Sequence, residues 1–430
     1  MASPGRPLRI LQVTPSYAPC VGGAERMLQA VSERLVSRGH QVTVFTTNAT
    51  TQPEMRSSRG GNLPRHEVLN GVMVRRFPTD PLSARVTRGL LGLRGGWRAS
   101  SWVFGEGVTM LRRLPAPHGL IGPVLRARAD VVVSANWIWP AAYGVHLARR
   151  IRPFRLVGLP ILHVARAWAD QPLFRPMLAR CDSVLTLTPA EQDFVRQRGA
   201  RRAHVVGAGA DPSAFDHRDG TALRAKLGLG TSPVIGFVGR QDFRKGVLAL
   251  LEAMHLVWRC YPEARLLLAG QQAHRSPEVI TALAAVDPDR RNRIVEVSDF
   301  VERDGPSILD ACDIVALPSV EESFGLVFLE AWMCRKPVVG ARIPSSECLI
   351  EPGVDGLLAA PLDGPDLAQC LLQLLGSPEL RAAMGERGYR KVLAHHTWDL
   401  VTDRWEAALG STVGDVEDVE DVENVEDGRR

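Results

Sequence analysis

The sequence predicts an α/β fold made of two doubly wound domains that face each other across a cleft. Short apolar segments typical of buried parallel strands alternate with helical segments through the first half of the chain. After a glycine-containing crossing at 207–212, the same alternation begins again at Val234. The 430 residues are enough for two or three domains. We expect an N-terminal domain at 1–205, a linker at 206–232, a C-terminal domain at 233–394, a crossover helix at 395–410 and a disordered acidic tail at 411–430.

In the first domain the pattern predicts strands at 8–13, 41–46, 72–77, 130–134, 155–162, 183–187 and 204–206. Helices are predicted at 24–37, up to Arg150 and from Pro189, and the polar stretch 48–70 is predicted to be irregular. Gly22 and Gly23 lie between the first strand and the first helix, where a βαβ unit can bind phosphate. A tight turn that needs two small residues explains this pair equally well, and both interpretations stay open.

The stretch 85–128 is strongly basic. Eight arginines and one acidic residue, Glu106, stand there among tryptophan, phenylalanine and leucine. A basic helix with such apolar residues can lie on an anionic membrane surface. A pair of solvated helices with aromatic core residues is the alternative.

In the second domain the pattern predicts strands at 234–238, 264–269, 294–297, 314–317 and 337–340. Helices are predicted at 245–259, 277–285, 305–312 and 326–334, followed by three more at 364–375, 378–394 and 398–409.

Composition limits the partners and the compartment. The tail 415–430 holds eight acidic residues and two arginines, so the remaining 50 basic and 39 acidic residues give the body a net charge of +11. A basic body favours nucleotides, phosphates or an anionic membrane, and no nucleic-acid-reading motif is present. Seven scattered cysteines without a CxxC pair indicate a reducing compartment. With no signal peptide and no run of 18 apolar residues, we expect a cytoplasmic protein, with peripheral attachment at the inner face of the membrane left open.

Two strand-to-helix turns in the second domain carry polar and charged residues. Glu322-Ser323-Phe324-Gly325 follows the strand 314–317 and precedes a helix that contains Glu330. Gly239-Arg240 follows the strand 234–238, and Lys245-Gly246 opens the next helix. Ligands of parallel sheets bind beyond the carboxyl ends of the strands, and free helix N–H groups attract anions there. Because arginine and lysine both suit phosphate, the two turns together predict a diphosphate site.

These residues resemble the retaining glycosyltransferases of family 4, which have the GT-B architecture of two Rossmann-like domains. The combination of Glu-x7-Glu with Gly-Arg…Lys-Gly is specific, although either motif alone is not. The resemblance covers nearly the whole body of the chain. It is carried by Pro19…Gly22-Gly23-Ala24-Glu25, Gly39-His40-x-Val42, His163, Gly209-Ala210-Asp211…Phe215, Gly239-Arg240…Lys245-Gly246, Asp299-Phe300-Val301, Pro318-Ser319…Glu322-Ser323-Phe324-Gly325…Glu330-Ala331, Lys336-Pro337-Val338-Val339 and Gly356.

The resemblance implies a role for each matching residue. Arg240 and Lys245 would hold the diphosphate of a nucleotide-sugar donor, beside Gly239. Glu322, with Ser323, Phe324 and Gly325, would orient the sugar. The ribose would bind Glu330, and the base would meet the backbone of Phe300 and Val301. Gly22 and Gly23 would close over the phosphates, and His163 would lie near the sugar and the acceptor, with an ordinary strand-end histidine as the alternative.

The implied reaction moves a sugar from a nucleoside diphosphate sugar to a sugar, lipid-linked or other hydroxyl acceptor, by a front-face mechanism. No cofactor beyond the donor is implied. An epimerase or phosphorylase of the same architecture and a non-catalytic nucleotide-sugar-binding protein are the alternatives. The sequence Asp287-Pro288-Asp289 spells the DxD metal motif of another glycosyltransferase fold, but its position after a helix favours a turn, so we expect no metal site. The chain departs from the family pattern at Asn136, Arg335, Ser345 and Ser346, so the base, the sugar and the acceptor do not follow from the resemblance.

Overall fold

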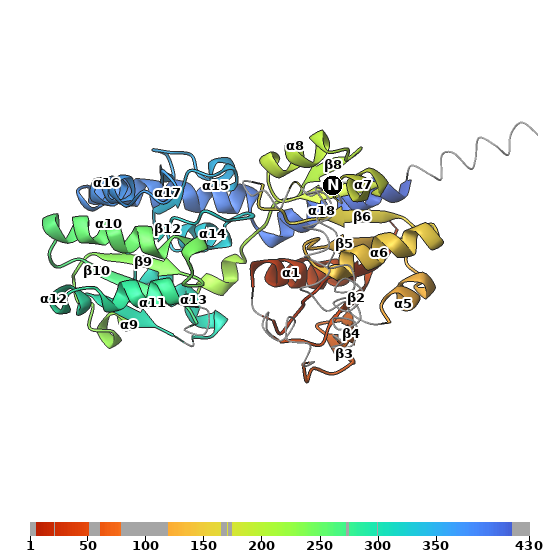
Figure 1. Cartoon of the computed structure of the whole chain (residues 1–430), viewed down its shortest axis with the longest axis horizontal. Helices are drawn as coiled ribbons and strands as arrows, with labels where there is room; N and C mark the ends of the chain where they lie inside the picture. Colours follow the sequence, from red (N-terminus) through yellow and green to blue (C-terminus); the bar gives the residue numbers. More distant parts are fainter. Residues whose placement is uncertain are drawn as a thin grey trace, which may run out of the picture. The chain divides into compact units, whose positions relative to one another are not determined.

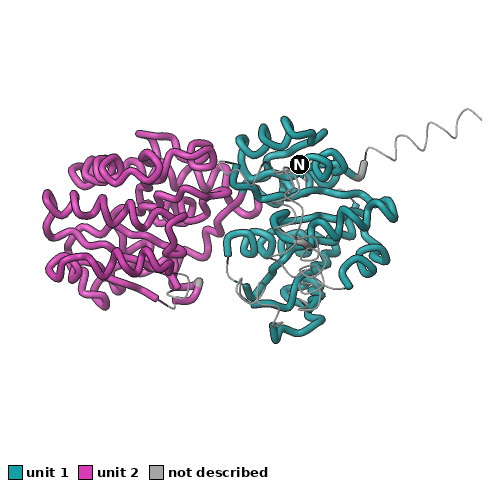
Figure 2. The backbone as a smooth tube through the Cα atoms, viewed as in Figure 1, with its two compact units in different colours: residues 1–207, 401–430 teal, residues 208–400 magenta. Residues whose placement is uncertain are grey.

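The computed structural model describes residues 6–20, 22–50, 61–78, 119–164, 170, 174–271, 275–298 and 300–414. The chain divides into two compact units (Figure 2). Unit 1 comprises residues 1–207 and 401–430, and unit 2 comprises residues 208–400. Each unit has its own sheet with helices packed against it (Figure 1).

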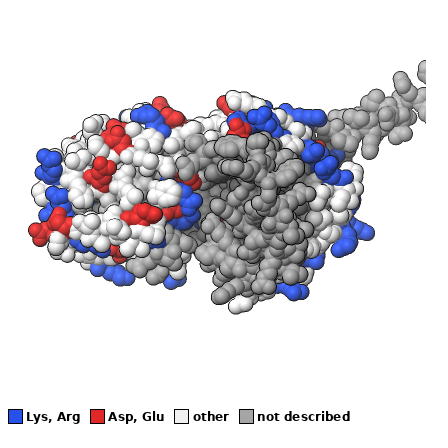
Figure 3. All heavy atoms as spheres, viewed as in Figure 1, with Lys and Arg blue, Asp and Glu red and all other residues white. Residues whose placement is uncertain are grey.

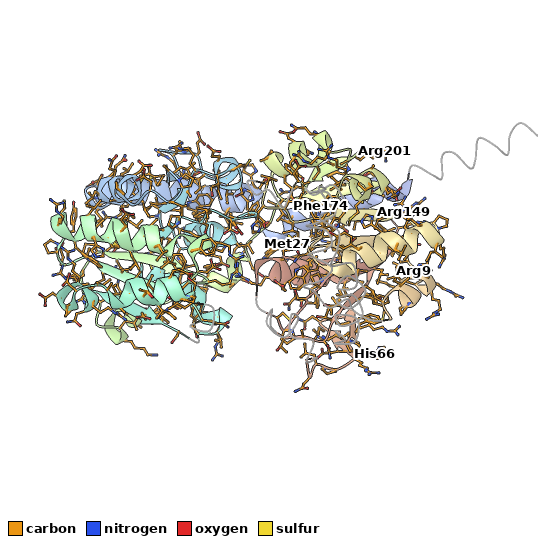
Figure 4. The ribbon with its side chains drawn as sticks, in the orientation of Figure 1. Arg9, Met27, His66, Arg149, Phe174 and Arg201 are labelled. Carbon is orange, nitrogen blue, oxygen red and sulfur yellow. The ribbon has the colours of Figure 1, made fainter. Side chains whose placement is uncertain are left out.

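Unit 1 contains an eight-stranded sheet in the order β3-β4-β2-β1-β5-β6-β7-β8. Its strands are β1 (Arg9–Val13), β2 (Gln41–Thr47), β3 (His66–Leu69), β4 (Val72–Phe77), β5 (Val131–Ala135), β6 (Leu156–Leu159), β7 (Ser183–Thr186) and β8 (Ala203–Val205). Its helices are α1 (Gly23–Ser37), α5 (Ile121–Arg126), α6 (Pro140–Ile151), α7 (Phe174–Arg180) and α8 (Pro189–Gln197). All neighbouring strands are parallel except the antiparallel pair β3–β4. Met27 of α1 and Phe174 of α7 are fully buried here (Figure 4).

Unit 2 contains a six-stranded, all-parallel sheet in the order β11-β10-β9-β12-β13-β14. Its strands are β9 (Val234–Val238), β10 (Arg265–Ala269), β11 (Ile294–Val297), β12 (Ile314–Leu317), β13 (Val338–Ala341) and β14 (Gly356–Ala359). Its helical elements are η2 (Pro212–Phe215), α9 (Gly220–Lys226), η3 (Phe243–Lys245), α10 (Val247–Cys260), α11 (Pro277–Ala284), α12 (Pro288–Arg291), η5 (Glu302–Asp304), α13 (Gly305–Asp310), α14 (Leu326–Met333), α15 (Pro344–Leu349), α16 (Gly364–Leu375) and α17 (Pro378–His395). Two Rossmann-like sheets are the architecture that the sequence predicted.

The structure corrects several local predictions. The stretch 48–70, predicted to be irregular, includes strand β3, which turns into β4 through Asn70-Gly71, both at positive φ. Asn-Gly is a strong hairpin signal, so this turn can be predicted from the sequence. The helix predicted from Lys245 is interrupted, because Gly246 is left-handed between η3 and α10. Elements α7, α15 and β14 were not predicted.

Other predictions fall partly outside the described residues. Residues 85–118 of the basic stretch and 415–430 of the tail lie there. Residues 411–414, predicted to belong to the disordered tail, are helical instead. Within the predicted linker 206–232, helix α9 packs against α13, and residues from Ala208 onward belong to unit 2. None of the helices in the described ranges is long and apolar enough to span a membrane.

The last helix, α18 (Trp398–Gly414), completes unit 1 from Val401 onward. Arg38 at the end of α1 forms ion pairs with Asp403 and Glu406, and His40 lies 2.8 Å from the Glu406 carboxylate. Before this helix, Ala210 and Thr397 form a bridge, so the chain enters and leaves unit 2 along two paired segments. Unit 1 is therefore assembled from two separate stretches of chain.

Helix α17 of unit 2 lies so close to the segment that follows α14 that Gly385 has no room for a side chain. A Cβ at Gly385 would overlap the carbonyl group of Arg335, which is backbone and cannot rotate away. We expect Gly385→Ala to lower the free energy of unfolding by about 1–3 kcal/mol, as overpacked substitutions do. Gly410 on α18 is exposed with nothing near its Cβ position, so Gly410→Ala should instead stabilise by about 0.5–1 kcal/mol. Chemical denaturation measures the free energy of unfolding of both variants. An equal change in Gly385→Ala and Gly410→Ala would contradict this packing.

Candidate functional site: two strand-end turns of unit 2

The turn after β9 is held by an aspartate. The carboxylate of Asp242 accepts the backbone N–H of Lys245 at 3.1 Å and so begins the short helix η3. The same carboxylate lies 3.1 Å from the Arg244 guanidinium and 4.0 Å from that of Arg240. Asp242 therefore fixes the backbone that presents the cations. Asp242 was not among the predicted site residues, although an aspartate directly before a helix is an N-cap signal.

The turn after β12 is joined to the first turn by backbone contacts. Val320 donates its N–H to the carbonyl of Arg244 at 2.8 Å. Gly246 has φ 77, and a Cβ there would overlap the carbonyl oxygen of Pro318. Only glycine combines this left-handed backbone with so close an approach. The two turns are thus held together before any side chain is considered.

Lys245 and Glu322 join the two turns by an ion pair. The ammonium and carboxylate are 2.6 Å apart, and the side chains are only 15% and 16% exposed. Strands β9 and β12 are neighbours, and the chain leaves β9 for β10 on its other side. This is a topological switch point, where open α/β sheets bind ligands. Arg240, at 39% exposure, is freer to turn toward an anion than Lys245.

The start of α14 lies beside this pair. Gly325 caps the helix with φ 98, and a Cβ there would meet the Phe328 ring at 2.6 Å. Ser323 is half-buried, whereas Phe324 is buried and contacts His396 edge-on with the ring centroids 5.7 Å apart. Glu330 is half-buried in the second turn of α14. On the face shown in Figure 3, unit 2 carries acidic and basic side chains side by side rather than a stripe of one sign.

The predicted base-binding turn follows β11. Phe300 is half-buried and Val301 is 52% exposed, whereas Asp299 lies outside the described residues. The N–H of Val301 donates to the carboxylate of Asp304 at 3.2 Å. The carbonyl oxygen of Val301 in turn accepts the backbone N–H of Asp304 at 2.9 Å. The backbone of Val301 is therefore bonded to Asp304 through both its N–H and its carbonyl.

In unit 1, the predicted residues lie at the carboxyl ends of parallel strands. Gly22 caps α1 after β1 with an extended backbone, and Gly23 is the first helical residue. A Cβ at Gly22 would overlap the carboxylate of Glu25, which accepts a hydrogen bond from Ser16. The glycine therefore makes room for a side chain of its own helix, which agrees with a tight turn and leaves the phosphate role untested.

His163 follows β6 and is half-buried. Two non-glycine residues near it have a left-handed backbone, Asn136 with φ 54 after β5 and Ile161 with φ 55 after β6. A β-branched residue in this region is an outlier, and such strain concentrates at functional sites. The two strands are neighbours, so the strained positions mark one edge of the sheet.

A buried carboxylate lies behind this edge. Glu191 of α8 is 1% exposed and accepts the backbone N–H groups of Leu162 and Leu187, each at 2.7 Å. Burial raises the pKa of Glu191 to about 7, although both hydrogen bonds oppose the rise. Thr188-x-x-Glu191 is a capping-box pattern, so the sequence alone marks Glu191 as a residue of the helix start.

Among the described residues, no group of three His, Cys, Asp or Glu side chains is arranged to hold a metal ion. Asp287, the first residue of the DxD sequence, caps α12 by accepting the N–H of Arg290 at 3.2 Å. This stretch is therefore the start of a short helix.

Comparisons with known proteins agree with this architecture. The family described as glycosyl transferases group 1 matches residues 232–377, and the glycosyl transferase 4-like domain matches residues 22–209. The chain is 27% identical to the alpha-D-kanosaminyltransferase of Streptomyces kanamyceticus over 84% of this chain and 92% of that protein. It is also 27% identical to the D-inositol 3-phosphate glycosyltransferase of Saccharomonospora viridis over 89% of this chain and 87% of that protein.

Solved structures share the fold. Sucrose-phosphate synthase from Thermosynechococcus elongatus superposes with a TM-score of 0.71 at 20% identity, covering 93% of this chain and 98% of that one. Anabaena HepE in complex with UDP and glucose superposes with a TM-score of 0.70 at 21% identity, covering 94% and 100%. Together with the two matched families, these relatives establish that the chain belongs to the glycosyl transferases of group 1, the GT4-like, GT-B-fold enzymes that transfer a sugar from a nucleotide sugar.

Proposed function

We propose that the two joined turns of unit 2 bind a nucleoside diphosphate sugar, and that the chain transfers this sugar to a hydroxyl acceptor with retention of configuration. The ion pair between Lys245 and Glu322 carries the proposal. It sets a phosphate-binding cation and a hydroxyl-binding carboxylate 2.6 Å apart at the switch point of the sheet. In a nucleotide sugar, the diphosphate and the sugar hydroxyls are adjacent in the same way.

The donor contacts follow from this placement. The Lys245 ammonium has three N–H donors, so it can bind a phosphate oxygen and still contact Glu322. Arg240 binds the diphosphate from the start of the same turn, after Gly239. Ser323, Phe324 and Gly325 offer the backbone at the start of α14, and Glu322 accepts hydrogen bonds from sugar hydroxyls.

The rest of the donor binds further along the strand ends of unit 2. Glu330 accepts the ribose hydroxyls, and the base meets Phe300 and Val301. The structures of Anabaena HepE with UDP and with UDP-glucose make UDP-glucose the first donor to test.

The acceptor is assigned to unit 1. Within this unit, Gly22 and Gly23 stay the residues predicted to contact phosphate, and His163 stays the residue predicted for the sugar and the acceptor. The acceptor is a sugar, lipid-linked or other hydroxyl compound, as in relatives named for kanosamine and inositol 3-phosphate transfer. Peripheral attachment to an anionic membrane through 85–128 stays a prediction. If the protein does not co-sediment with anionic vesicles at low salt, the predicted membrane attachment is wrong.

The proposed mechanism takes place on one face of the sugar. The bond from the anomeric carbon to the leaving phosphate breaks, and the acceptor oxygen forms its bond on the same face. The acceptor proton passes to the leaving phosphate oxygen. Arg240 and Lys245 stabilise the charge that develops on that phosphate, the kind of electrostatic effect that usually dominates catalysis.

Because these two cations neutralise the diphosphate, we expect a metal-independent enzyme. Activity should survive treatment with EDTA and gel filtration, measured as nucleoside diphosphate release. An enzyme that stops under EDTA and recovers only with magnesium or manganese would contradict this mechanism.

A thermal-shift screen of UDP-, GDP- and ADP-sugars tests the proposal as a whole. A ligand at about 100 times its dissociation constant stabilises a protein by about 2.7 kcal/mol, so the matching donor should raise the melting temperature. The shift should disappear in Lys245→Ala and persist in Arg390→Ala, whose side chain is 75% exposed on α17. If the donor raises the melting temperature of both variants, it binds elsewhere on the protein.

A further inference from the structure

The carboxylate of Glu191 lies directly behind the turn that carries His163. One oxygen accepts the N–H of Leu162, the residue before His163, and the other accepts the N–H of Leu187. Leu162 and Leu187 are themselves buried, so the bonds lie in a dry environment. Within the described ranges, no lysine, arginine or histidine forms an ion pair with Glu191. Burying a carboxylate without an ion pair costs stability, and its two hydrogen bonds offset part of this cost.

The turn that it holds departs from relaxed geometry. Ile161 has a left-handed backbone immediately before Leu162. On the other side, the backbone N–H of Trp137 donates to the carbonyl of Pro160 at 3.2 Å, next to the left-handed Asn136. Strained residues persist only where their surroundings hold them, and here the ends of β5 and β7 provide two opposite anchors.

We propose that Glu191 is a positioning residue for His163. It fixes the backbone of the 160–163 turn to the end of β7 and the start of α8, and thereby sets where the imidazole stands at the sheet edge. A carboxylate suits this task because its two oxygens accept two N–H groups at once, whereas an amide offers one acceptor oxygen. The inference rests on the acceptor-side role proposed above for His163.

Asp182 supplies a matched control. Its carboxylate also accepts a backbone N–H from β6, that of Leu156 at 2.7 Å, but at the amino end of the strand. It pairs in addition with Arg149 of α6 (Figure 4). Asp182→Asn weakens a carboxylate contact to the start of β6, whereas Glu191→Gln weakens a carboxylate contact to the turn that follows β6 and carries His163.

The test observes His163 directly. The protein is labelled with ¹³C at histidine Cε1 and ¹⁵N at leucine, and His163→Asn assigns the imidazole signal. In Glu191→Gln we expect the signals of His163, Leu162 and Leu187 to shift while the histidines of unit 2 stay in place. In Asp182→Asn the His163 signal should stay in place.

Turnover adds a second measurement, with UDP-glucose as the probe. Glu191→Gln should lower kcat about tenfold to a hundredfold with an unchanged KM for the donor, because misplacing a group by 1 Å can lower the rate about a hundredfold. A His163 signal that is unmoved in Glu191→Gln, with the protein merely less stable, would overturn the proposal. If Glu191→Gln does not fold, the His163→Asn protein supplies another measurement, the amide signals of Leu162 and Leu187 as a function of pH. Because one carboxyl group accepts both N–H groups, both amide signals should shift at the same pH. Separate titration of the two amides would equally overturn it.

The two proposals fail in distinguishable ways. If His163→Ala transfers sugar as fast as the wild type, the role of His163 is wrong. The coupling of Glu191 to the turn would still be visible in the signals of Leu162 and Leu187. If His163→Ala is inactive but Glu191→Gln is fully active with an unmoved signal, only the positioning role fails.

Discussion

Replacing Lys245 by methionine should lower sugar transfer by about 10²–10³-fold in kcat, the loss seen when one preorganised charge-stabilising donor is removed from an active site. Methionine keeps most of the alkyl stem and removes the ammonium that faces Glu322. The charge that develops on the leaving diphosphate then has only Arg240 and the helix start to stabilise it. Steady-state kinetics with the donor found in the thermal-shift screen measures the effect.

The same substitution leaves the half-buried carboxylate of Glu322 without its partner, so lost stability must be separated from lost catalysis. The double variant Lys245→Met, Glu322→Gln removes both charges. Its free energy of unfolding shows how much of the lost stability comes from the unpaired carboxylate. Because Glu322 is itself placed on the sugar, turnover is compared in Lys245→Met, at a temperature where this variant is folded. Arg390→Ala, whose side chain is 75% exposed on α17, should match the wild type in both measurements. Full activity of Lys245→Met would refute the assignment.

A second large effect concerns acid stability and His146. This histidine is 6% exposed on α6, its ring contacts Trp137 edge-on, and neither ring nitrogen has a hydrogen-bond partner in the described part of the chain. Burial lowers the pKa of His146 to about 3, with Arg149 and Arg180 adding to the shift. The native state thus holds this ring neutral, whereas the unfolded state binds a proton below pH 6.5.

Stability from His146 is present above about pH 6.5 and is lost as the pH falls toward 3. The full loss is about 5 kcal/mol, and about 2 kcal/mol of it should be reached at pH 5. His146→Leu removes this dependence, so its free energy of unfolding should fall less than that of the wild type between pH 8 and pH 5. Val145→Ala, buried on the same helix, should lower stability equally at both values. If the free energy of unfolding of His146→Leu depends on pH as that of the wild type does, the native state does not hold His146 as a buried neutral ring.

The architecture was predictable because its signals are local. Apolar runs such as 234–238 and 314–317 coincide with strands β9 and β12, and their spacing by helical segments implies parallel sheets. Strand-end turns were likewise predicted from the motifs Gly-Arg…Lys-Gly and Glu-x7-Glu. The hairpin at Asn70-Gly71 was readable too, and was overlooked because the surrounding stretch is polar.

The connections within the site were not predictable, because they depend on strand order. Lys245 and Glu322 are 77 residues apart in sequence, and they meet only because β9 lies beside β12. Glu191 and Leu162 are 29 residues apart and meet through the pairing of β6 with β7. The departure of Gly246 from a helix likewise reflects the approach of Pro318, a tertiary contact.

The interrupted path of unit 1 has a consequence for biosynthesis. Helix α18, which supplies the partners of Arg38 and His40, follows unit 2 in the chain. At about 5–20 residues per second, a ribosome needs about 10–40 s to make the roughly 190 residues in between. During this interval the N-terminal sheet has emerged without its last helix, whereas unit 2 becomes available for folding as one uninterrupted stretch. Completion of the first unit to be synthesised therefore waits for the second.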